Sequence, residues 1–159
     1  EEVMTIRMNT QQIEMQIGST TLSSRLIEGK FPDYTQILPK EKKTTITVKV
    51  KDLLSTIKRL HYFAKEQSNN ITFSIENSVI TLTTRETQYG RDEATIEGKV
   101  EGEMQNKIAL SSLYSIDFLS RLTEEEVVID IIDRFHPAVF RVPKNAGVLH
   151  LVMPLRRSK

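Results

Sequence analysis

Three histidines, His61, His136 and His150, are the side chains of this sequence that could bind a metal or exchange protons near neutral pH. No two of them share the spacing of metal ligands, and the chain contains no cysteine to complete such a site. Dinucleotide-binding GxGxxG, Walker A, GxSxG and HExxH patterns do not occur either. The sequence therefore predicts no metal, no cofactor and no catalytic centre.

Charged clusters offer a second kind of chemistry. Glu124–Glu126 and Asp92–Glu93 could pair carboxylates, but the first cluster precedes a strand in a predicted turn, where solvated charge is the better interpretation. Basic and hydroxyl side chains lie away from the apolar stripes of two predicted helices: Lys51, Ser55, Lys58, Arg59 and Lys65 on the first, Arg121 and three serines on the second. Two such helices could contact phosphates without reading bases, although a solvated basic face is the plainer alternative.

Two apolar segments at opposite ends of the chain could bind a partner. Leu26–Pro39 is a stiff strap, because proline fixes φ while Phe31, Tyr34 and Ile37 carry apolar surface. Near the C-terminus, Pro154 ends a strand that carries Leu151, Met153 and Leu155. Methionine suits surfaces that accept varied apolar partners, but an edge strand with a frayed tail would have the same sequence.

The elements that position these residues follow from periodicity. Alternating residues predict a small antiparallel meander over residues 3–27, too small to be stable alone. Residues 44–100 then show a strand, an amphipathic helix, a hairpin over 70–84 and a further strand over 92–100. The same order recurs about 60 residues later, with Leu113, Ile116, Leu119 and Leu122 predicted on one helix face. The pattern predicts a pseudo-symmetric α+β domain with two helices side by side on antiparallel sheet.

Length and composition limit the remaining possibilities. The 159 residues suffice for one well-packed domain, and a formal net charge of +1 is too small to argue for nucleic-acid binding by itself. No apolar run approaches the roughly 20 residues that span a bilayer, and no signal-peptide pattern is present. We expect a cytoplasmic protein without a membrane partner.

A family resemblance rests on RLIEGKFPDYTQILP, residues 25–39, together with LVMPLR, residues 151–156. These segments resemble the β sliding clamp of bacterial DNA polymerase III, in which G-x-F/Y-P-D-Y precedes the third domain and V-M-P-L/M-R closes the chain. The stretches between them are similar to the two halves of that third domain. The resemblance implies an α+β DNA-clamp fold, with residues 1–30 as the C-terminal strands of clamp domain 2 and residues 31–159 as clamp domain 3.

The resemblance also implies a function. The family's members are non-enzymatic processivity factors that form a homodimeric ring around duplex DNA when full length. Their partners, which include the DNA polymerase III alpha subunit, the clamp loader delta subunit and other proteins with a clamp-binding motif, insert peptides into a hydrophobic cleft between the second and third domains. The matching cleft positions are Pro32, Gln36, Ile37, Pro137, Leu151, Val152, Met153, Pro154, Leu155 and Arg156. Gln36 departs from the family, which often has a basic residue there.

Other roles carry over by position. Lys51, Lys58, Arg59 and Arg121 match the helices that line the DNA channel, and Tyr62 and Phe63 match the subunit interface. Asp92–Val100 resembles the edge strand that continues the sheet across that interface. Two alternatives remain on the sequence alone: a small protein-interaction or ligand-binding module without DNA encirclement, and a small enzyme that uses the strap and tail as a pocket. The lack of a catalytic constellation counts against the enzyme.

Overall fold

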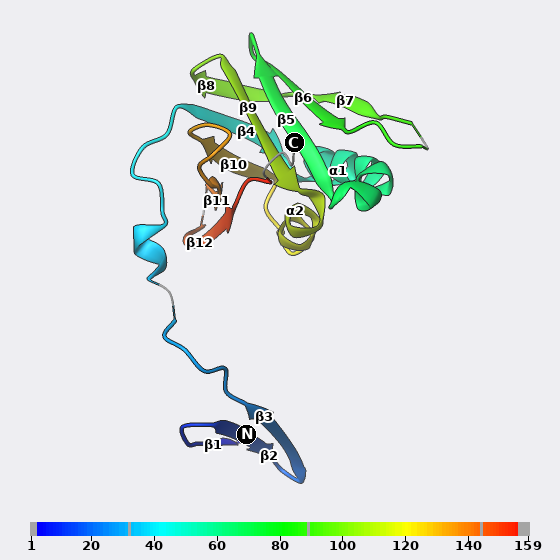
Figure 1. Ribbon diagram of the computed structural model, residues 1–159. Coiled ribbons are helices and arrows are strands. Elements are labelled where there is room, and N and C mark those ends of the chain that lie inside the picture. Colours follow the sequence, from blue (N-terminus) through cyan, green and yellow to red (C-terminus); the bar gives the residue numbers. More distant parts are fainter. Residues whose placement is uncertain (1–2, 32, 89, 144, 156–159) are drawn as a thin grey trace. The chain divides into compact units, whose positions relative to one another are not determined.

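The computed structural model describes residues 3–31, 33–88, 90–143 and 145–155 (Figure 1). The chain divides into two compact units, Glu1–Tyr34 and Thr35–Lys159. Within the described ranges, no helix is long and apolar enough to cross a membrane.

The first unit is an antiparallel sheet of three strands, β1 (Met4–Met8), β2 (Gln12–Ile17) and β3 (Thr20–Arg25), which confirms the predicted meander. Met4 pairs with Ile17, Ile6 with Met15, and Met15 with Leu22. Because paired residues point to the same face, one face is apolar and the other is polar. The apolar face comprises Met4, Ile6, Met8, Ile13, Met15, Ile17 and Leu22, and much of it is exposed, including 57% of Ile6 and 62% of Leu22.

The second unit contains two sheets and two helices. Its strands are β4 (Thr44–Lys49), β5 (Asn70–Glu76), β6 (Val79–Thr84), β7 (Glu93–Ile96), β8 (Gly98–Gly102), β9 (Gln105–Ser111), β10 (Glu126–Ile131), β11 (Ala138–Val142) and β12 (Asn145–Val152). The helices are α1 (Val50–Ala64) and α2 (Ser112–Leu119), with short 3-10 turns η1 (Tyr34–Gln36) and η2 (Lys65–Gln67). The five-stranded sheet has the order β12-β11-β10-β4-β8 and the four-stranded sheet the order β7-β6-β5-β9.

The predicted repeat appears as an exchange of strands. The first strand of the first half, β4, pairs antiparallel with β10 of the second half, and β9 pairs in the same way with β5 of the first half. The helix starts match as well: the Val50 N–H donates to the Glu125 carbonyl at 2.8 Å, and the Ser112 N–H donates to the Asn69 carbonyl at 2.8 Å. Each helix therefore begins on a hydrogen bond to the opposite half.

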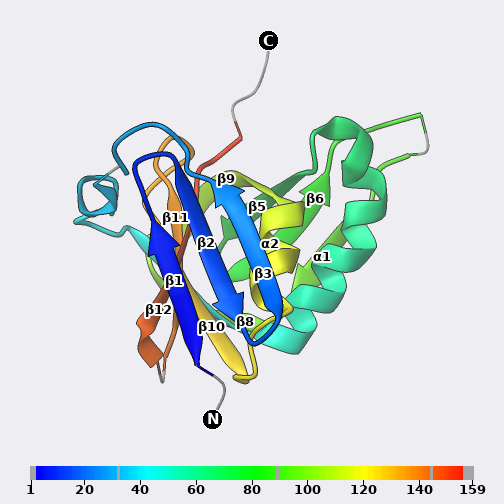
Figure 2. The ribbon, with the colours of Figure 1, turned by 90° about the horizontal axis from the view of Figure 1, so that it is seen from below.

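Helix α1 forms where apolar residues recur at spacings of three and four. Its buried side chains are Val50, Leu53, Ile57, Leu60 and Ala64, and the helix packs against β4, β5, β6 and β7. The two helices lie side by side and contact each other (Figures 1 and 2). The core between helices and sheets is continuous and includes side chains from both halves, such as Phe73 and Phe140.

Helix α2 differs from its prediction. Its buried residues are Ser112, Ser115 and Leu119, whereas Leu113 is 49% exposed. The Ser115 hydroxyl donates to the Ser111 carbonyl at 2.9 Å, so this buried hydroxyl is satisfied inside the helix. The predicted apolar face was wrong at Leu113, because small side chains are what face the neighbouring helix.

The segment Asp92–Val100 is also not one strand. It forms β7 at the edge of the four-stranded sheet and β8 at the edge of the five-stranded sheet. The change of sheet occurs at Gly98, where an added Cβ would lie 2.5 Å from Val48 Cγ1. A side chain would not fit there without movement of its neighbours, so glycine permits the crossing.

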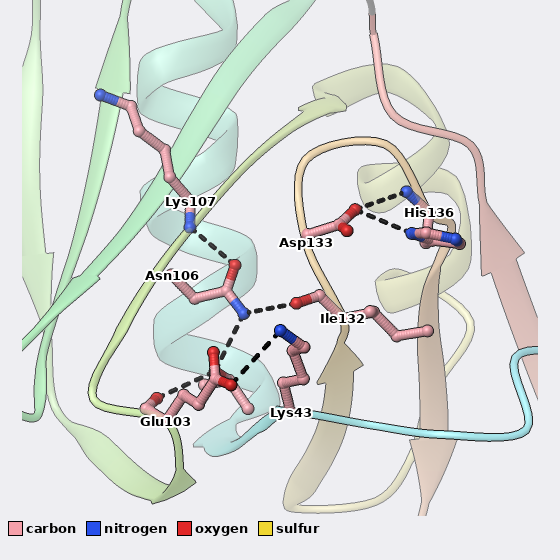
Figure 3. Close-up of polar contacts among 8 residues, drawn as sticks. Lys43, Glu103, Asn106, Lys107, Ile132, Asp133 and His136 are labelled. Atoms are coloured by element: carbon pink, nitrogen blue, oxygen red, sulfur yellow. Dashed lines mark hydrogen bonds and ion pairs between the residues drawn. The ribbon is translucent and has the colours of Figure 1, made fainter.

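A polar junction holds the starts of β4 and β9 together (Figure 3). The Asn106 amide donates to the Thr44 hydroxyl at 2.9 Å and to the Ile132 carbonyl at 3.1 Å. The Thr44 hydroxyl in turn donates to the Glu103 carbonyl at 2.9 Å, and Lys43 pairs with the Glu103 carboxylate at 3.4 Å. Because Thr44 is fully buried, this junction satisfies polar groups that water cannot reach.

Candidate functional site

The last strand, β12, lies at an edge of the five-stranded sheet and presents an apolar face outward. Side chains alternate along a strand, so Leu149, Leu151 and Met153 share one side while Val152 points to the other. Val152 is 2% exposed and belongs to the core, whereas Leu149 is 45% and Met153 57% exposed. The tail therefore offers every second apolar residue to solvent.

The neighbouring strand and the strap extend this face. Val139 pairs with Leu151, and Arg141 pairs with Leu149, so both β11 residues lie on the same side. Leu38 and Pro39 of the strap line a cavity of about 290 Å³ together with Val139 and Leu149. We call this concavity the strap cavity; aliphatic and charged side chains line it in equal number.

A charged group closes one side of the strap cavity. The Asp130 carboxylate accepts a hydrogen bond from Arg141 Nε at 2.6 Å and one from the Thr45 hydroxyl at 2.8 Å. Lys42 Nζ lies 3.7 Å from the same carboxylate. Because the Asp130 side chain is only 13% exposed, these partners compensate a charge that is largely removed from water. These contacts hold the Arg141 guanidinium against Asp130, and Arg141 is paired with Leu149 of the neighbouring strand.

The other predicted cleft residues are placed as follows. Gln36 ends η1, Ile37 is 45% exposed, and Pro137 is buried before β11. Beyond Pro154, the Leu155 N–H donates to the Ala109 carbonyl of β9 at 2.8 Å, so the tail reaches the edge of the second sheet. Pro32 and Arg156 lie outside the described residues. Sequence reasoning missed Val139 and Leu149; only the pairing register would have found them.

His150 anchors the terminal strand on its inner side. Its ring stacks on Phe118 of α2 with centroids 4.5 Å apart and packs edge-on against Phe140. Burial lowers the pKa of His150, and its Nε2 has no hydrogen-bond partner among the described residues. The neutral imidazole therefore acts as an aromatic packing group between β12 and α2.

The basic residues of α1 form one exposed stripe. Lys51, Lys58 and Lys65 follow each other at intervals of seven residues, which places them on one side of the helix, and all three are exposed. His61, one turn after Lys58, contacts the Ser112 hydroxyl of α2 at 2.7 Å. We call Lys51, Lys58 and Lys65 the lysine stripe. The stripe borders the second helix, and its lysines make no ion pair with any residue that the structure describes.

The other two predicted channel residues are engaged in ion pairs. Arg59 Nε lies 3.0 Å from Asp92, and Arg121 lies 2.8 Å from Asp117 one turn earlier. Both arginines are exposed, so these pairs are weak, but they direct the guanidinium groups toward carboxylates. The structure thus separates the four predicted cations into two arginines with carboxylate partners and two lysines with none among the described residues.

Tyr62 and Phe63 end α1 with an aromatic pair. Their rings are 5.5 Å apart in an edge-to-face arrangement. Tyr62 is 73% exposed and Phe63 is half-buried, so the Phe63 ring packs against a Tyr62 ring that is largely in solvent. Within the described ranges, no three His, Asp or Glu side chains gather as metal ligands.

Comparison with known proteins gives a consistent family. The family model described as DNA polymerase III beta subunit, C-terminal domain, matches residues 35–156. The beta sliding clamp of Bacillus subtilis is 28% identical over 159 residues, which cover 98% of this chain and 42% of that protein. The beta sliding clamp of Synechocystis is 25% identical over 157 residues, covering 98% and 40%. The chain spans about two fifths of the length of these curated relatives.

Solved structures agree with the sequence relatives. The beta subunit of DNA polymerase III from Thermotoga maritima superposes with a TM-score of 0.81 at 27% identity, over 98% of this chain and 42% of that one. The sliding clamp of Bartonella birtlesii bound to griselimycin gives a TM-score of 0.82 at 26% identity, over 96% and 41%. Together with the strand exchange and the paired helices, these matches establish the α+β clamp fold. This chain belongs to the family of the DNA polymerase III beta subunit, C-terminal domain.

Proposed function

We propose that this chain is the C-terminal part of a DNA sliding clamp, an accessory subunit without catalytic activity. In the intact protein, two subunits would form a ring around duplex DNA and tether the replicative polymerase. The membership of residues 35–156 in the clamp family supports this proposal. The curated relatives are more than twice as long as this chain, and the proposed ring and its partners are those of a whole clamp.

The domain assignment is part of the proposal: residues 1–30 are the closing strands of the second clamp domain, and residues 31–159 are the third. The division of the chain into compact units falls close to that boundary in the sequence, between Tyr34 and Thr35. The exposed apolar face of β1–β3 also supports it, since three short strands bury too little surface to be stable alone. Such a face fits a sheet that the rest of its domain covers.

The partner cleft is proposed at the outward face of β12. The observation that carries it is the alignment of Leu151 and Met153 with Val139 and the strap cavity, which gives an apolar surface beside a stiff segment. The expected ligands are clamp-binding peptides of the DNA polymerase III alpha subunit, the clamp loader delta subunit and similar proteins. A related clamp bound to griselimycin supports ligand binding by this fold.

DNA and subunit contacts are proposed on the helices. The lysine stripe would face duplex DNA through contacts to phosphate that do not depend on sequence, which suits a ring that slides. The exposed Tyr62 side chain and the adjacent Phe63 would pack against the other subunit of the intact clamp. Such a protein would act in the cytoplasm, where the replicating chromosome lies.

A peptide titration tests the cleft. A clamp-binding peptide with glutamine, leucine and phenylalanine should bind this chain in calorimetry, and Met153→Ala and Leu155→Ala should each weaken it about tenfold because buried apolar contact is lost. Val79→Ala, which shortens an exposed side chain on β6, is the matched control and should leave the affinity unchanged. Equal affinity in the folded double variant and in the unaltered chain would remove these residues from the cleft.

A further inference from the structure

A second pocket lies on the face of the four-stranded sheet that points away from the helices. Along β5, Ile71 and Phe73 are buried in the core that α1 covers, so Asn70 and Thr72 point to the opposite face. On that face a cavity of about 340 Å³ is lined from β5, β6 and β9 and from the segment after β6. We call it the outer pocket.

The outer pocket contains a buried acceptor without a partner. Asn70 is 4% exposed, and its Oδ1 has no hydrogen bond to any residue that the structure describes. Buried polar atoms are almost always paired, and an orphan acceptor destabilises the fold unless something supplies a donor. A ligand N–H group would supply that donor after a rotation of the Asn70 side chain that brings Oδ1 into the outer pocket.

Cations surround this acceptor. Arg85, Arg91 and Lys107 line the outer pocket, and Glu86 is the one carboxylate among its described lining residues. Arg91 is paired with Glu93 at 2.8 Å, but Arg85 and Lys107 make no ion pair with any described residue. The Lys107 ammonium points away from Asn106 and from the polar junction (Figure 3). The outer pocket is therefore complementary to a negatively charged group.

The outer pocket adjoins the C-terminal tail that forms part of the proposed cleft. Ala109, which lines it, accepts the hydrogen bond from the Leu155 N–H, and Leu155 belongs to the apolar tail. We propose that the outer pocket binds an acidic segment of a partner's peptide, on the side of the cleft where the tail joins β9. This inference rests on the proposed peptide-binding function and adds a charge requirement to it.

The cations and the amide of the outer pocket bind different groups of the peptide. Carboxylates of the acidic segment pair with Arg85 and Lys107, while a peptide N–H donates to Asn70 Oδ1. A peptide fits better than a nucleic-acid backbone for two reasons. Phosphodiesters offer no donor to the orphan oxygen, and the lysine stripe proposed for DNA lies on a helix, on the other side of this sheet.

Three peptides and the whole chain test the proposal. The first peptide carries the apolar clamp-binding core, the second adds a flank of glutamates, and the third is the acidic flank alone. Affinities come from calorimetry at low and high salt, and binding to the outer pocket comes from NMR shifts of the Asn70 amide and the Thr72 and Thr83 backbones. We expect the second peptide to bind about tenfold more tightly than the first at low salt, with the difference shrinking as salt rises.

Variants assign that difference to the outer pocket. Arg85→Gln combined with Lys107→Gln should abolish the advantage of the second peptide and leave the first unaffected. Lys99→Gln, an exposed lysine on β8, is the matched control and should preserve the advantage. Asn70→Ala should weaken the second peptide about threefold while the free chain melts at the same or a higher temperature, since an orphan acceptor is removed. An asparagine with a purely structural role would instead lower the melting temperature.

The outcomes separate this proposal from the proposed function. If the first and second peptides bind equally, the outer pocket is overturned and the cleft stands. If the first peptide does not bind, the proposed peptide-binding cleft is overturned, and the third peptide, the acidic flank alone, then tests the outer pocket. NMR shifts at Asn70 and Thr72 on adding this peptide would support the outer pocket, and their absence would overturn it. An oligonucleotide that shifts these resonances more strongly than the acidic flank assigns the pocket to nucleic acid and overturns the peptide.

Discussion

At the scale of single residues, Gly102 shows how closely the beginning and the end of the first half approach each other. Its backbone has a φ of +88°, in the left-handed region that favours glycine, and an added Cβ would overlap the Lys43 carbonyl oxygen. That carbonyl also accepts the Glu103 N–H at 2.8 Å, so it is not free to move aside. The entry into β4 and the exit from β8 thus touch backbone to backbone.

Gly102→Ala should destabilise the fold by about 2–4 kcal/mol, because backbone strain and steric overlap add. Gly90→Ala is the matched control: its φ is +106°, but an added Cβ would meet nothing within 4 Å. Urea unfolding of both variants separates the two causes. Equal losses of stability would mean that strain alone matters and that the contact with Lys43 does not.

A second residue-scale prediction concerns pH. Burial lowers the pKa of His150, and burial together with the nearby Lys65 charge lowers the pKa of His61. The unfolded chain binds these protons more readily, so stability is complete above the ordinary histidine pKa of 6.5 and is lost as pH falls below it. Melting temperatures should therefore fall between pH 7 and pH 5.

Substitution assigns the effect to the buried rings. His150→Phe keeps an aromatic ring against Phe118 and should flatten the pH dependence, whereas His136→Gln, at an exposed histidine, should not. The Asp133 carboxyl contributes only at lower pH: partial burial raises its pKa, but hydrogen bonds from Phe135 and His136 outweigh it, so the pKa lies below 3.8 (Figure 3). An unchanged pH slope in His150→Phe would contradict the assignment.

At the scale of elements, the contact between α1 and α2 depends on small side chains. Ser112 and Ser115 are 1% exposed, and the Ser112 hydroxyl donates to the Asn69 carbonyl at 3.0 Å. Since that hydroxyl has one proton, the His61 Nδ1 beside it must carry the hydrogen and donate to Ser112. The serines let the helices approach, and Ser112 links them through its hydrogen bond with His61.

Ser115→Leu should destabilise the fold by about 1–3 kcal/mol, because added methyl groups overpack the buried contact between the helices. Leu113→Ala should change stability by less than about 0.5 kcal/mol, since Leu113 is half exposed on the other side of α2. Chemical denaturation of both variants is the measurement. A larger loss of stability in Leu113→Ala than in Ser115→Leu would support the apolar face predicted from the sequence.

These helices also show what the sequence can predict. Five buried apolar residues in α1 repeat at helical spacing, so its position and inner face followed from periodicity. Helix α2 buries serines, and no pattern distinguishes a packed serine from an exposed one. The change of sheet at Gly98 and the pairing of Val139 with Leu151 are long-range features that depend on tertiary register, which local pattern does not encode.

At the scale of the whole molecule, the fold determines which cations have a carboxylate partner, and the composition does not reveal it. The net charge is only +1, yet the lysine stripe on α1 has no carboxylate partner within the described part of the chain. Arg59 carries the same charge but is paired with Asp92, 33 residues away in sequence. Sequence reasoning selected all four cations equally, because it could not see which carboxylates the fold would bring near.

The chain should bind duplex DNA weakly, with Kd on the order of 10⁻⁴ to 10⁻⁶ M at physiological salt and a steep decrease as salt rises. Lys51→Gln and Lys58→Gln should each lower the slope of log affinity against log salt by about one, whereas Lys99→Gln on β8 should not. Fluorescence anisotropy over a salt series measures these slopes. Tight binding that is insensitive to salt would argue against the lysine stripe.

The exchange of β4 and β9 between the two sheets has a consequence for folding. Neither half contains a complete sheet, because the five-stranded sheet takes β4 and β8 from the first half and the four-stranded sheet takes β9 from the second. Each half therefore needs strands of the other before its hydrophobic face is closed. The second unit therefore resembles an intramolecular domain-swapped dimer, in which the short connection between β8 and β9 replaces a subunit boundary. Cleavage of that connection would leave two fragments that each need strands of the other. The two fragments should therefore fold when they are mixed, and neither should fold by itself.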